Sequence, residues 1–383
     1  MNRSVWRLTL VFSTAVLLAA CGNKETKEAL AKSDALAKQK QYHDANEVLV
    51  DALQAREEKL RDAAGTPTDV TANDALRAKV KSDPEILKME RAQIPLYLHL
   101  ERADMASAVY GDILAGDPKN TVVYDLLNDP DPDIRAGAVR VLGLVASPDS
   151  INALAKATKD SDKDVRRAAV SALGSIKDDP NVVPPLIDTL KDSYWFVRSE
   201  AASALGQEHD GRAVKPLLDA AGDSDATVQE ASGLALVSIV KDSAAHPDAN
   251  DFVSHLTDKD PKIVLVSAVC LAILKDKRAI PVLEGLVSSE DAVARLDAVK
   301  GLGETGDPSV IPMLRVTLKS TDINMRGWSI IGLGNLKDQT SLPDLQAIAN
   351  DATQPDPIRN AAGAAIAKIT GQNPGTGGAP SSP

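Results

Sequence analysis

The residues most open to covalent chemistry are two cysteines, the only ones in a chain of 383 residues. Cys21 follows directly on the run 8–20, which is apolar apart from three hydroxyl side chains. Its thiol is a candidate for covalent modification. Cys270 stands alone in the second half of the chain, where a lone thiol often packs as a small apolar side chain. With Cys21 used in this way, the sequence predicts no disulfide within the chain.

The segment before Cys21 resembles the lipobox of bacterial lipoproteins, in which Leu and two small residues precede the cysteine. The chain reads Leu18-Ala19-Ala20-Cys21 there, after a start that carries two arginines. The apolar run is shorter than the roughly 20 residues that a membrane span needs. The resemblance implies that residues 1–20 are a signal peptide, cleaved before Cys21, and that acyl chains are attached to Cys21. An ordinary signal peptide with a chance cysteine is the alternative.

The residue after the cysteine bears on localisation, because in enteric bacteria Asp at that position favours retention in the inner membrane. The chain has Gly22 instead. By this resemblance we expect a protein held by lipid in the cell envelope, on the periplasmic face of the outer membrane. Two or more acyl chains anchor stably, since each buried methylene contributes roughly 0.8 kcal/mol.

Metal and acid–base chemistry would fall to histidines, but none of the five lies in a His-x-x-x-His pattern, and the chain has no Cys-x-x-Cys. The sequence also lacks the Gly-x-Ser-x-Gly nucleophile motif, a phosphate loop and a dinucleotide fingerprint. We therefore expect no catalytic residue, cofactor, metal or small-molecule substrate. The histidines are His43, His99, His209, His246 and His255.

The composition limits both the core and the partners. Apolar residues make up 44% of the chain, but aromatic residues only 3%, so the interior must consist of Ala, Val, Leu and Ile. The formal net charge is -11. A chain this acidic has no electrostatic basis for binding nucleic acid, where Lys and Arg neutralise phosphates.

From about residue 120 the sequence repeats with a period of roughly 31 residues, which marks one supersecondary unit used many times. Large apolar residues such as Ile134 and Val165 stand eight positions before the last aligned residue of each copy, and small residues such as Ala138 and Ala169 stand four before it. This spacing predicts one face of a helix. The eight aligned residues are Leu142, Leu173, Leu205, Leu236, Leu271, Leu302, Leu333 and Ile366.

A second helix is expected before each of these, opened by a proline in most copies and anchored by a leucine. Proline fits the first helical turn, where its missing N–H would have no partner. Aspartates in the turns, such as Asp162 and Asp225, can cap the helix that follows. The anchoring residues are Leu154, Leu186, Leu217, Leu283, Leu314 and Leu345.

Residues 120–370 resemble HEAT repeats, specifically the short type found in phycobilisome lyases. The resemblance implies an all-α solenoid of about eight antiparallel helix pairs, usually a scaffold that binds proteins. It also leaves a HEAT-like lyase-type enzyme as the alternative function. Deoxyhypusine hydroxylases, another HEAT-like class, use His-Glu pairs, whereas this chain has only the reversed Glu208-His209. Cys270 stands in a column of small residues, so we expect it to be buried rather than nucleophilic.

One column of the repeat is basic and follows the first large apolar residue of the helix. In HEAT-like folds such residues form a ladder with aspartates of neighbouring repeats, and we expect the same here rather than an anion site. The fourth and fifth copies have Gln229 and Val264 instead, and the step between these copies is the longest. We therefore expect residues 225–275 to open first. The basic residues are Arg135, Arg166, Arg198, Arg295, Arg326 and Arg359.

Outside the repeats, residues 21–119 are expected to be a helical region behind the lipid anchor. Residues 29–60 resemble a tetratricopeptide helical hairpin, and the alternative is a helical cap on the end of the solenoid. The segment 64–72, rich in Thr, Pro and Gly, predicts a loop. The tail 371–383 consists largely of Gly, Pro and Ser and predicts disorder.

The candidate binding site is a set of apolar residues at aligned positions of the repeat that hold polar residues in earlier copies. In those copies the columns hold residues such as Arg140, Ser171 and Glu200. Exposed apolar patches mark interaction sites, so the sequence predicts a groove for a protein partner of unknown identity. The alternative is that these side chains thicken the core. The groove residues are Leu234, Leu265, Val266, Val269, Leu296, Trp328 and Ile331.

Overall fold

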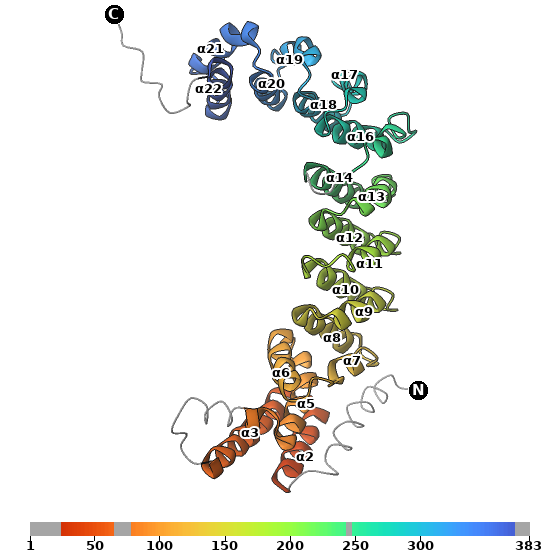
Figure 1. Ribbon diagram of the computed structural model, residues 1–383, viewed down its shortest axis with the longest axis vertical. Helices are drawn as coiled ribbons and strands as arrows, with labels where there is room; N and C mark the ends of the chain where they lie inside the picture. The colour runs from red at the N-terminus through yellow and green to blue at the C-terminus, as the bar shows by residue number, and fades with distance from the viewer. Residues whose placement is uncertain (1–23, 65–77, 243–246, 372–383) are drawn as a thin grey trace, which may run out of the picture. The chain divides into compact units, whose positions relative to one another are not determined.

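The computed structural model describes residues 24–64, 78–242 and 247–371, and these form α-helices and short 3₁₀ helices without any β-strand (Figure 1). The predicted all-α fold class is confirmed. The chain divides into two compact units, one up to Ala204 and one from Leu205. The sequence did not predict this division, which falls inside the repeat region.

The first unit begins with two helical hairpins. Helices α2 and α3 pack together, as do α5 and α6, and α3 also packs on α5. Their shared core contains Leu30, Ala45, Leu49, Met89 and Leu96. A hairpin over the region expected to resemble a tetratricopeptide is therefore present, while its family stays a prediction. The four helices are α2 (Lys24–Lys38), α3 (Tyr42–Ala64), α5 (Pro84–His99) and α6 (Ala103–Gly116).

The rest of the described chain consists of helix pairs, each with a first and a second helix. In the first unit the pairs are α7 (Val122–Leu126) with α8 (Pro132–Val145), α9 (Pro148–Ala157) with α10 (Lys163–Ser175), and α11 (Val183–Thr189) with α12 (Trp195–Glu208), whose last turn passes Ala204.

In the second unit the pairs are α13 (Val214–Ala220) with α14 (Ala226–Lys241), α15 (Ala249–Val253) with α16 (Pro261–Ile273), α17 (Ile280–Leu286) with α18 (Ala292–Glu304), α19 (Ile311–Thr317) with α20 (Ile323–Asn335), and α21 (Leu342–Asn350) with α22 (Asp356–Thr370). Short 3₁₀ turns lead into α13, α17, α19 and α21. Across both units the described residues thus contain the eight pairs that the repeat predicted.

The turns before the second helices carry the predicted aspartate caps. In most pairs an Asp side chain accepts hydrogen bonds from backbone N–H groups of the first helical turn, which have no partner within the helix. Asp162, for example, accepts from the N–H groups of Asp164 and Val165. These caps fix where each second helix begins. They are Asp131, Asp162, Asp225, Asp260, Asp291 and Asp322.

The aligned leucines and the leucines of the first helices are fully buried, as the repeat predicted. Ile366 is an exception, because it is only half-buried in the last described helix. Small residues let successive second helices approach closely. A Cβ added at Gly143 would lie 2.7 Å from the Cβ of Ala172, and one at Gly334 would lie 2.8 Å from that of Ala365.

The expected Arg–Asp ladder is present in the first unit. Arg135 of α8 donates to the carboxylate of Asp160 at 2.9 and 2.7 Å, and Asp160 belongs to the next pair. Arg166 of α10 makes the same contact to Asp192, one pair further on.

In the second unit the ladder expectation was wrong for three of its arginines. Arg295 donates to the backbone carbonyls of Ser289 and Glu290, and Arg326 reaches the side-chain amide oxygen of Gln354. The position that holds Asp160 or Asp192 in the first unit holds a serine in the turns before α18 and α20. These serines are Ser289 and Ser320. Arg359 pairs with Asp356 of its own helix.

Several expectations fall on residues that the structure does not describe. Cys21 and the signal peptide lie outside the described residues, as do residues 65–72 of the predicted loop, His246, and the tail beyond Gly371. Among the helices that are described, none combines the length and apolar character needed to cross a membrane.

Candidate partner-binding surface

The seven predicted groove residues all belong to second helices of the second unit, and we call the surface they form the unit-2 face. In order along the chain, α14, α16, α18, α20 and α22 each pack against the next, so residues on these helices are brought side by side. Leu234 lies on α14, Leu265, Val266 and Val269 on α16, Leu296 on α18, and Trp328 and Ile331 on α20.

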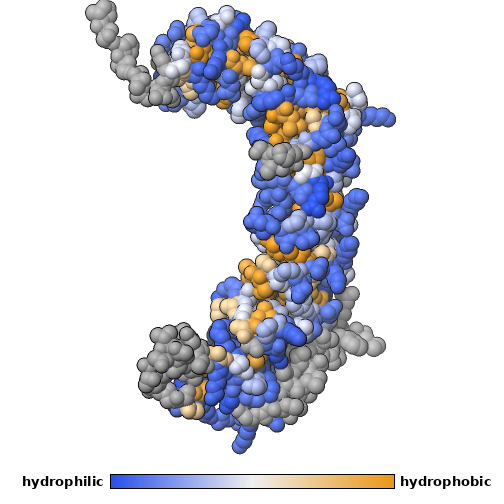
Figure 2. All heavy atoms as spheres, viewed as in Figure 1, coloured by the Kyte–Doolittle hydropathy of each residue, from blue (hydrophilic) through white to orange (hydrophobic). Residues whose placement is uncertain are grey.

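Three residues of the unit-2 face are substantially open to solvent. Leu234 is 65% exposed, and Trp328 and Ile331 are each 37% exposed. The other four are half-buried. None of the seven is fully buried. Core residues of the same helices, such as Leu236 and Leu333, are by contrast completely covered. Figure 2 shows apolar side chains gathered over α16 to α22 on the side in view.

A lysine and an aspartate of α18 lie close to Trp328. The Nζ atom of Lys300 lies 5.4 Å from the centre of the Trp328 ring, within the range of a cation–π contact. The same ammonium group is 2.9 Å from the Asp297 carboxylate. The tryptophan is thus held by a charged neighbour on α18 while more than a third of its side chain stays open.

A shallow pocket of about 380 Å³ adjoins the unit-2 face between α20 and α22. Its walls are mainly apolar, and Ile331 faces Pro357 and the alanines 361, 364 and 365 there. Lys368 and Asn360 form its polar edge. A pocket of this size and lining suits one or two apolar side chains of a partner.

In the first unit the corresponding positions hold polar, charged or small residues and no large apolar one. Arg140, Arg167, Ser171 and Ser203 are exposed, and Ser199 and Glu200 are half-buried. Burial raises the pKa of the Glu200 carboxyl, while Arg167 and the Ser171 hydroxyl act in the opposite direction. These positions in the first unit therefore differ in character from those of the unit-2 face.

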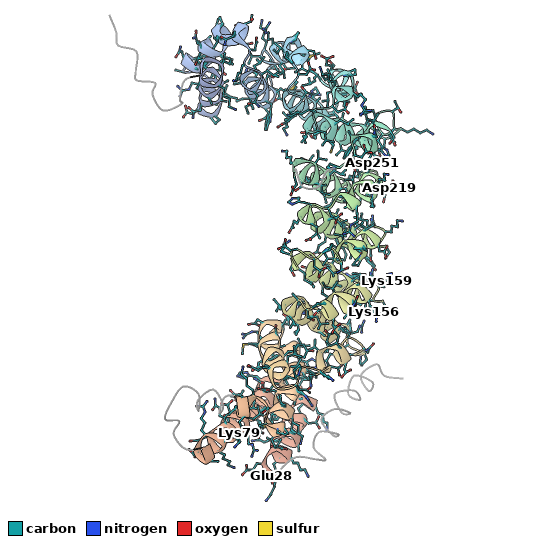
Figure 3. The ribbon with its side chains drawn as sticks, viewed as in Figure 1. Glu28, Lys79, Lys156, Lys159, Asp219 and Asp251 are labelled. Atoms are coloured by element: carbon teal, nitrogen blue, oxygen red, sulfur yellow. The ribbon has the colours of Figure 1, made fainter. Side chains whose placement is uncertain are left out.

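The first helices present a charged surface instead. Figure 3 shows Lys156 on α9, Lys159 in the turn after it and, in the other unit, Asp219 on α13 and Asp251 on α15. Some of these charges join successive pairs. Lys159 Nζ lies 3.4 Å from the carboxylate of Asp188, and Lys215 Nζ lies 3.1 Å from that of Asp251. Lys159 and Asp251 are therefore each paired with an opposite charge of a neighbouring first helix.

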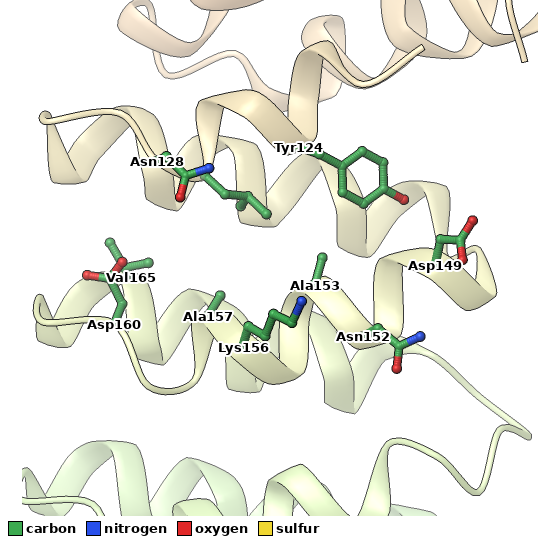
Figure 4. A pocket seen from close by; sticks show the side chains of 10 residues that line it. Tyr124, Asn128, Asp149, Asn152, Ala153, Lys156, Ala157, Asp160 and Val165 are labelled. Atoms are coloured by element: carbon green, nitrogen blue, oxygen red, sulfur yellow. The ribbon is translucent and has the colours of Figure 1, made fainter. Parts of the chain in front are cut away.

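One further pocket, of about 480 Å³, lies between α7 and α9 of the first unit (Figure 4). Apolar side chains such as Leu127, Ala153 and Val165 line it together with polar ones such as Tyr124 and Lys156. Asp160, which also lines it, is already bound by Arg135. The repeat did not predict this pocket, although two of its lining residues, Asp160 and Val165, stand at positions that the copies share.

Cys270 and the histidines are the side chains whose types suit covalent, acid–base or metal chemistry. Cys270 is completely buried in α16, and burial raises the pKa of its thiol. Its expected role as a small buried side chain is confirmed. His209 lies beside Asp242 and the Ser238 hydroxyl, and His99 stacks on Tyr42. Within the described ranges no three His, Cys, Asp or Glu side chains are grouped so that they could hold a metal ion.

Sequence reasoning missed an aromatic cluster at the start of α12, formed by Tyr194, Trp195 and Phe196. Tyr194 and Trp195 are 45% and 46% exposed. A signal was available, since Tyr194 occupies the position that holds the capping aspartate in six other copies.

A family profile for HEAT repeats matches residues 121–206, 183–249 and 281–367, which together make up more than half of the chain. The chain therefore belongs to the HEAT repeat family, and its fold is the α-solenoid that the resemblance implied. Among curated proteins none matches the chain.

Solved structures agree with this fold. Importin beta in an ammonium sulfate condition has a TM-score of 0.53 at 13% identity, over 93% of this chain and 61% of importin beta. Kap95p bound to RanGDP has a TM-score of 0.51 at 12% identity, over 94% of this chain and 60% of the other. The CpcE–CpcF complex of phycocyanin lyase from Nostoc sp. PCC7120 is more distant, with a TM-score of 0.30 at 20% identity, over 64% of this chain and 85% of that chain. These likenesses concern the fold alone.

Proposed function

We propose that this protein is a non-catalytic scaffold of the bacterial cell envelope that binds a protein partner through the unit-2 face. Acyl chains on Cys21 would hold it at the periplasmic face of the outer membrane. The observation that carries the proposal is the exposure of Leu234, Trp328 and Ile331 on second helices that pack side by side. Large exposed apolar side chains in one area favour association with a partner.

Spacing along the unit-2 face supports a helical or extended partner segment. Packed helices lie roughly 8–10 Å apart, so the three steps from α14 to α20 span roughly 25–30 Å. An amphipathic helix of about 18–20 residues has that length. Its apolar positions would meet Leu234, the α16 residues and Trp328 in turn, and its end would reach the pocket beside Ile331.

Site-specific photocrosslinking tests the proposal with a matched control. A photoreactive amino acid replaces Leu234, which is 65% exposed on a second helix, or Val316, which is 66% exposed on the first helix α19. We expect a discrete crosslinked product in cells from position 234 and none from position 316. Trp328→Ala should remove that product while the melting temperature changes little.

Equal crosslinking from both positions, or a product at 234 that survives Trp328→Ala, would contradict the proposal. A lyase-type enzyme is the competing function. Purified protein would then modify a bilin-type or other substrate. That activity would be lost on substitution in the pocket between α7 and α9, in a variant whose unit-2 face is unchanged.

A further inference from the structure

Three consecutive aromatic residues project from the solenoid edge where α12 begins. The ring of Phe196 lies 5.7 Å from that of Tyr194 and 5.8 Å from that of Trp195, centre to centre. These contacts hold the three rings together as one cluster. In a chain that is only 3% aromatic, such a cluster at a partly exposed position calls for an explanation beyond packing.

Tyr194 stands where six other second helices have a stabilising aspartate cap. Tyrosine cannot accept the backbone N–H groups of the first turn, and loss of such a cap costs roughly 1 kcal/mol. Positions that give up a local stabilising feature are commonly functional.

A basic residue of the preceding pair completes the cluster. The Nζ atom of Lys163 lies 5.7 Å from the centre of the Tyr194 ring and 5.6 Å from that of Phe196. Arg166 also contacts the Tyr194 ring, but its guanidinium is bound to Asp192 and is nearly buried. The Lys163 ammonium lies 4.0 Å from the Asp164 carboxylate, but both side chains are open to solvent. Lys163 is therefore the more accessible of the two cations, and we call Tyr194, Trp195, Phe196 and Lys163 the aromatic edge.

We propose that the aromatic edge is a contact site for the phospholipid headgroup region. Tyrosine and tryptophan are enriched at membrane interfaces because one end of each side chain is apolar and the other forms hydrogen bonds. Lys163 can bury its stem along the rings while its ammonium group reaches a lipid phosphate. The rings lie at the start of a helix and in neither of the two pockets described above. This arrangement suits contact with a deformable lipid surface better than insertion of a single side chain of a protein partner.

The charge of the chain indicates which lipids are involved. A net charge of -11 opposes approach to anionic lipids, and the aromatic edge offers a single available lysine against this. Binding must then depend on burial of the rings. We expect attachment to zwitterionic phosphatidylethanolamine and phosphatidylcholine vesicles, with little gain from anionic lipid and little loss in salt. This contact does not rest on acylation of Cys21, and its test omits the acyl chains.

Tryptophan fluorescence can report the contact directly. A chain that starts at residue 22 keeps every described helix and contains only two tryptophans, Trp195 and Trp328. In the Trp328→Phe variant Trp195 is the only reporter. We expect its emission to shift to the blue on vesicles and to be quenched by brominated acyl chains. In the Trp195→Phe variant Trp328 reports the unit-2 face, and we expect no quenching there.

A second variant separates binding from folding. Tyr194→Asp restores the cap that other copies have, so its melting temperature should equal or exceed that of the parent. Its vesicle affinity should fall roughly tenfold, the loss expected for one buried aromatic side chain. The proposal is overturned if Trp195 is not quenched, if Trp328 is quenched equally, or if Tyr194→Asp binds vesicles as well as the parent. A cluster that instead docks a protein would give the first of these results.

Discussion

Arg166 and Asp192 form a two-bonded ion pair that joins successive repeats of the first unit. The Nε–Oδ2 and Nη2–Oδ1 distances are 2.6 and 3.0 Å, and a third nitrogen donates to the carbonyl of Asp160. Both side chains are at most 10% exposed. Burial alone would raise the pKa of the Asp192 carboxyl, but hydrogen bonds from Arg166 and the Tyr194 N–H outweigh it and hold the pKa below its usual value.

Arg166→Ala should destabilise the protein by about 3 kcal/mol, because it leaves the Asp192 carboxylate buried without its partner. The lowered pKa means that the pair stabilises the fold above the unfolded-state value and that this is lost as the pH falls through the folded-state value. Arg295→Ala is the control, since Arg295 contacts only backbone carbonyls in the hydrogen bonds described. Urea denaturation with equal losses for the two variants would refute this role of the pair.

Glu90 of α5 should make the stability of the first unit depend on pH. Burial raises the pKa of its carboxyl to about 7, with Asp112 and Glu57 adding to the effect and Lys81 opposing it. The folded state then holds a proton that the unfolded state releases above 4.5, so stability is lost as the pH rises from 4.5 to about 7. Glu90→Gln should therefore raise the melting temperature at pH 8 more than at pH 5. Glu58→Gln, exposed on α3, should show no such difference in thermal melts.

Ser232→Ala should stabilise the second unit by roughly 1 kcal/mol, since the buried Ser232 hydroxyl has no hydrogen-bond partner among the described residues. Most copies have Ala in this column, so the methyl group fits. Ser329 provides the matched comparison, because its hydroxyl lies 2.6 Å from that of Thr317 and donates to the Met325 carbonyl. Ser329→Ala should be destabilising. Chemical denaturation in which both variants move in the same direction would count against this explanation.

Cys21→Ser should leave an unprocessed precursor or a protein that salt and carbonate washes remove from membranes. The reason is that the lipobox-like segment offers no other thiol for acylation. Metabolic labelling with a fatty-acid analogue gives the measurement. Labelling of the Ser variant as strong as that of the natural chain would remove the basis for the anchor.

The repeat made much of the fold predictable, because every copy must bury the same columns against its neighbours. Leu173 and Leu302 are buried, and Asp162 and Asp225 cap helices, for reasons that act within one copy and the next. The aligned position alone does not determine whether a buried polar side chain finds a hydrogen-bond partner. Ser232 and Ser329 align, yet only Ser329 finds a partner, since that depends on Thr317 of a first helix.

Departures from the repeat were harder to interpret. The sequence predicted the unit-2 face from apolar residues in polar columns, but whether Trp328 was core or surface depended on the bulk of its neighbours on α18. The ladder was overpredicted in the second unit, because the pair after Arg295 has Ser320 in place of the aspartate and Arg326 meets Gln354. The hairpin of α2 and α3 was found from its apolar stripe, which many helical hairpins share, so its family stays open.

The complete burial of Cys270 makes the rate of its chemical modification a measure of local opening of the solenoid. Its thiol lies in α16, within the segment 225–275 that the sequence expects to open first. A thiolate attacks a disulfide reagent only where the reagent can reach it, and burial opposes both the access of the reagent and the ionisation of the thiol. In a Cys21→Ser chain this is the sole remaining thiol. The rate at which such a reagent modifies the chain therefore measures how often α16 separates from its neighbours, without any introduced label.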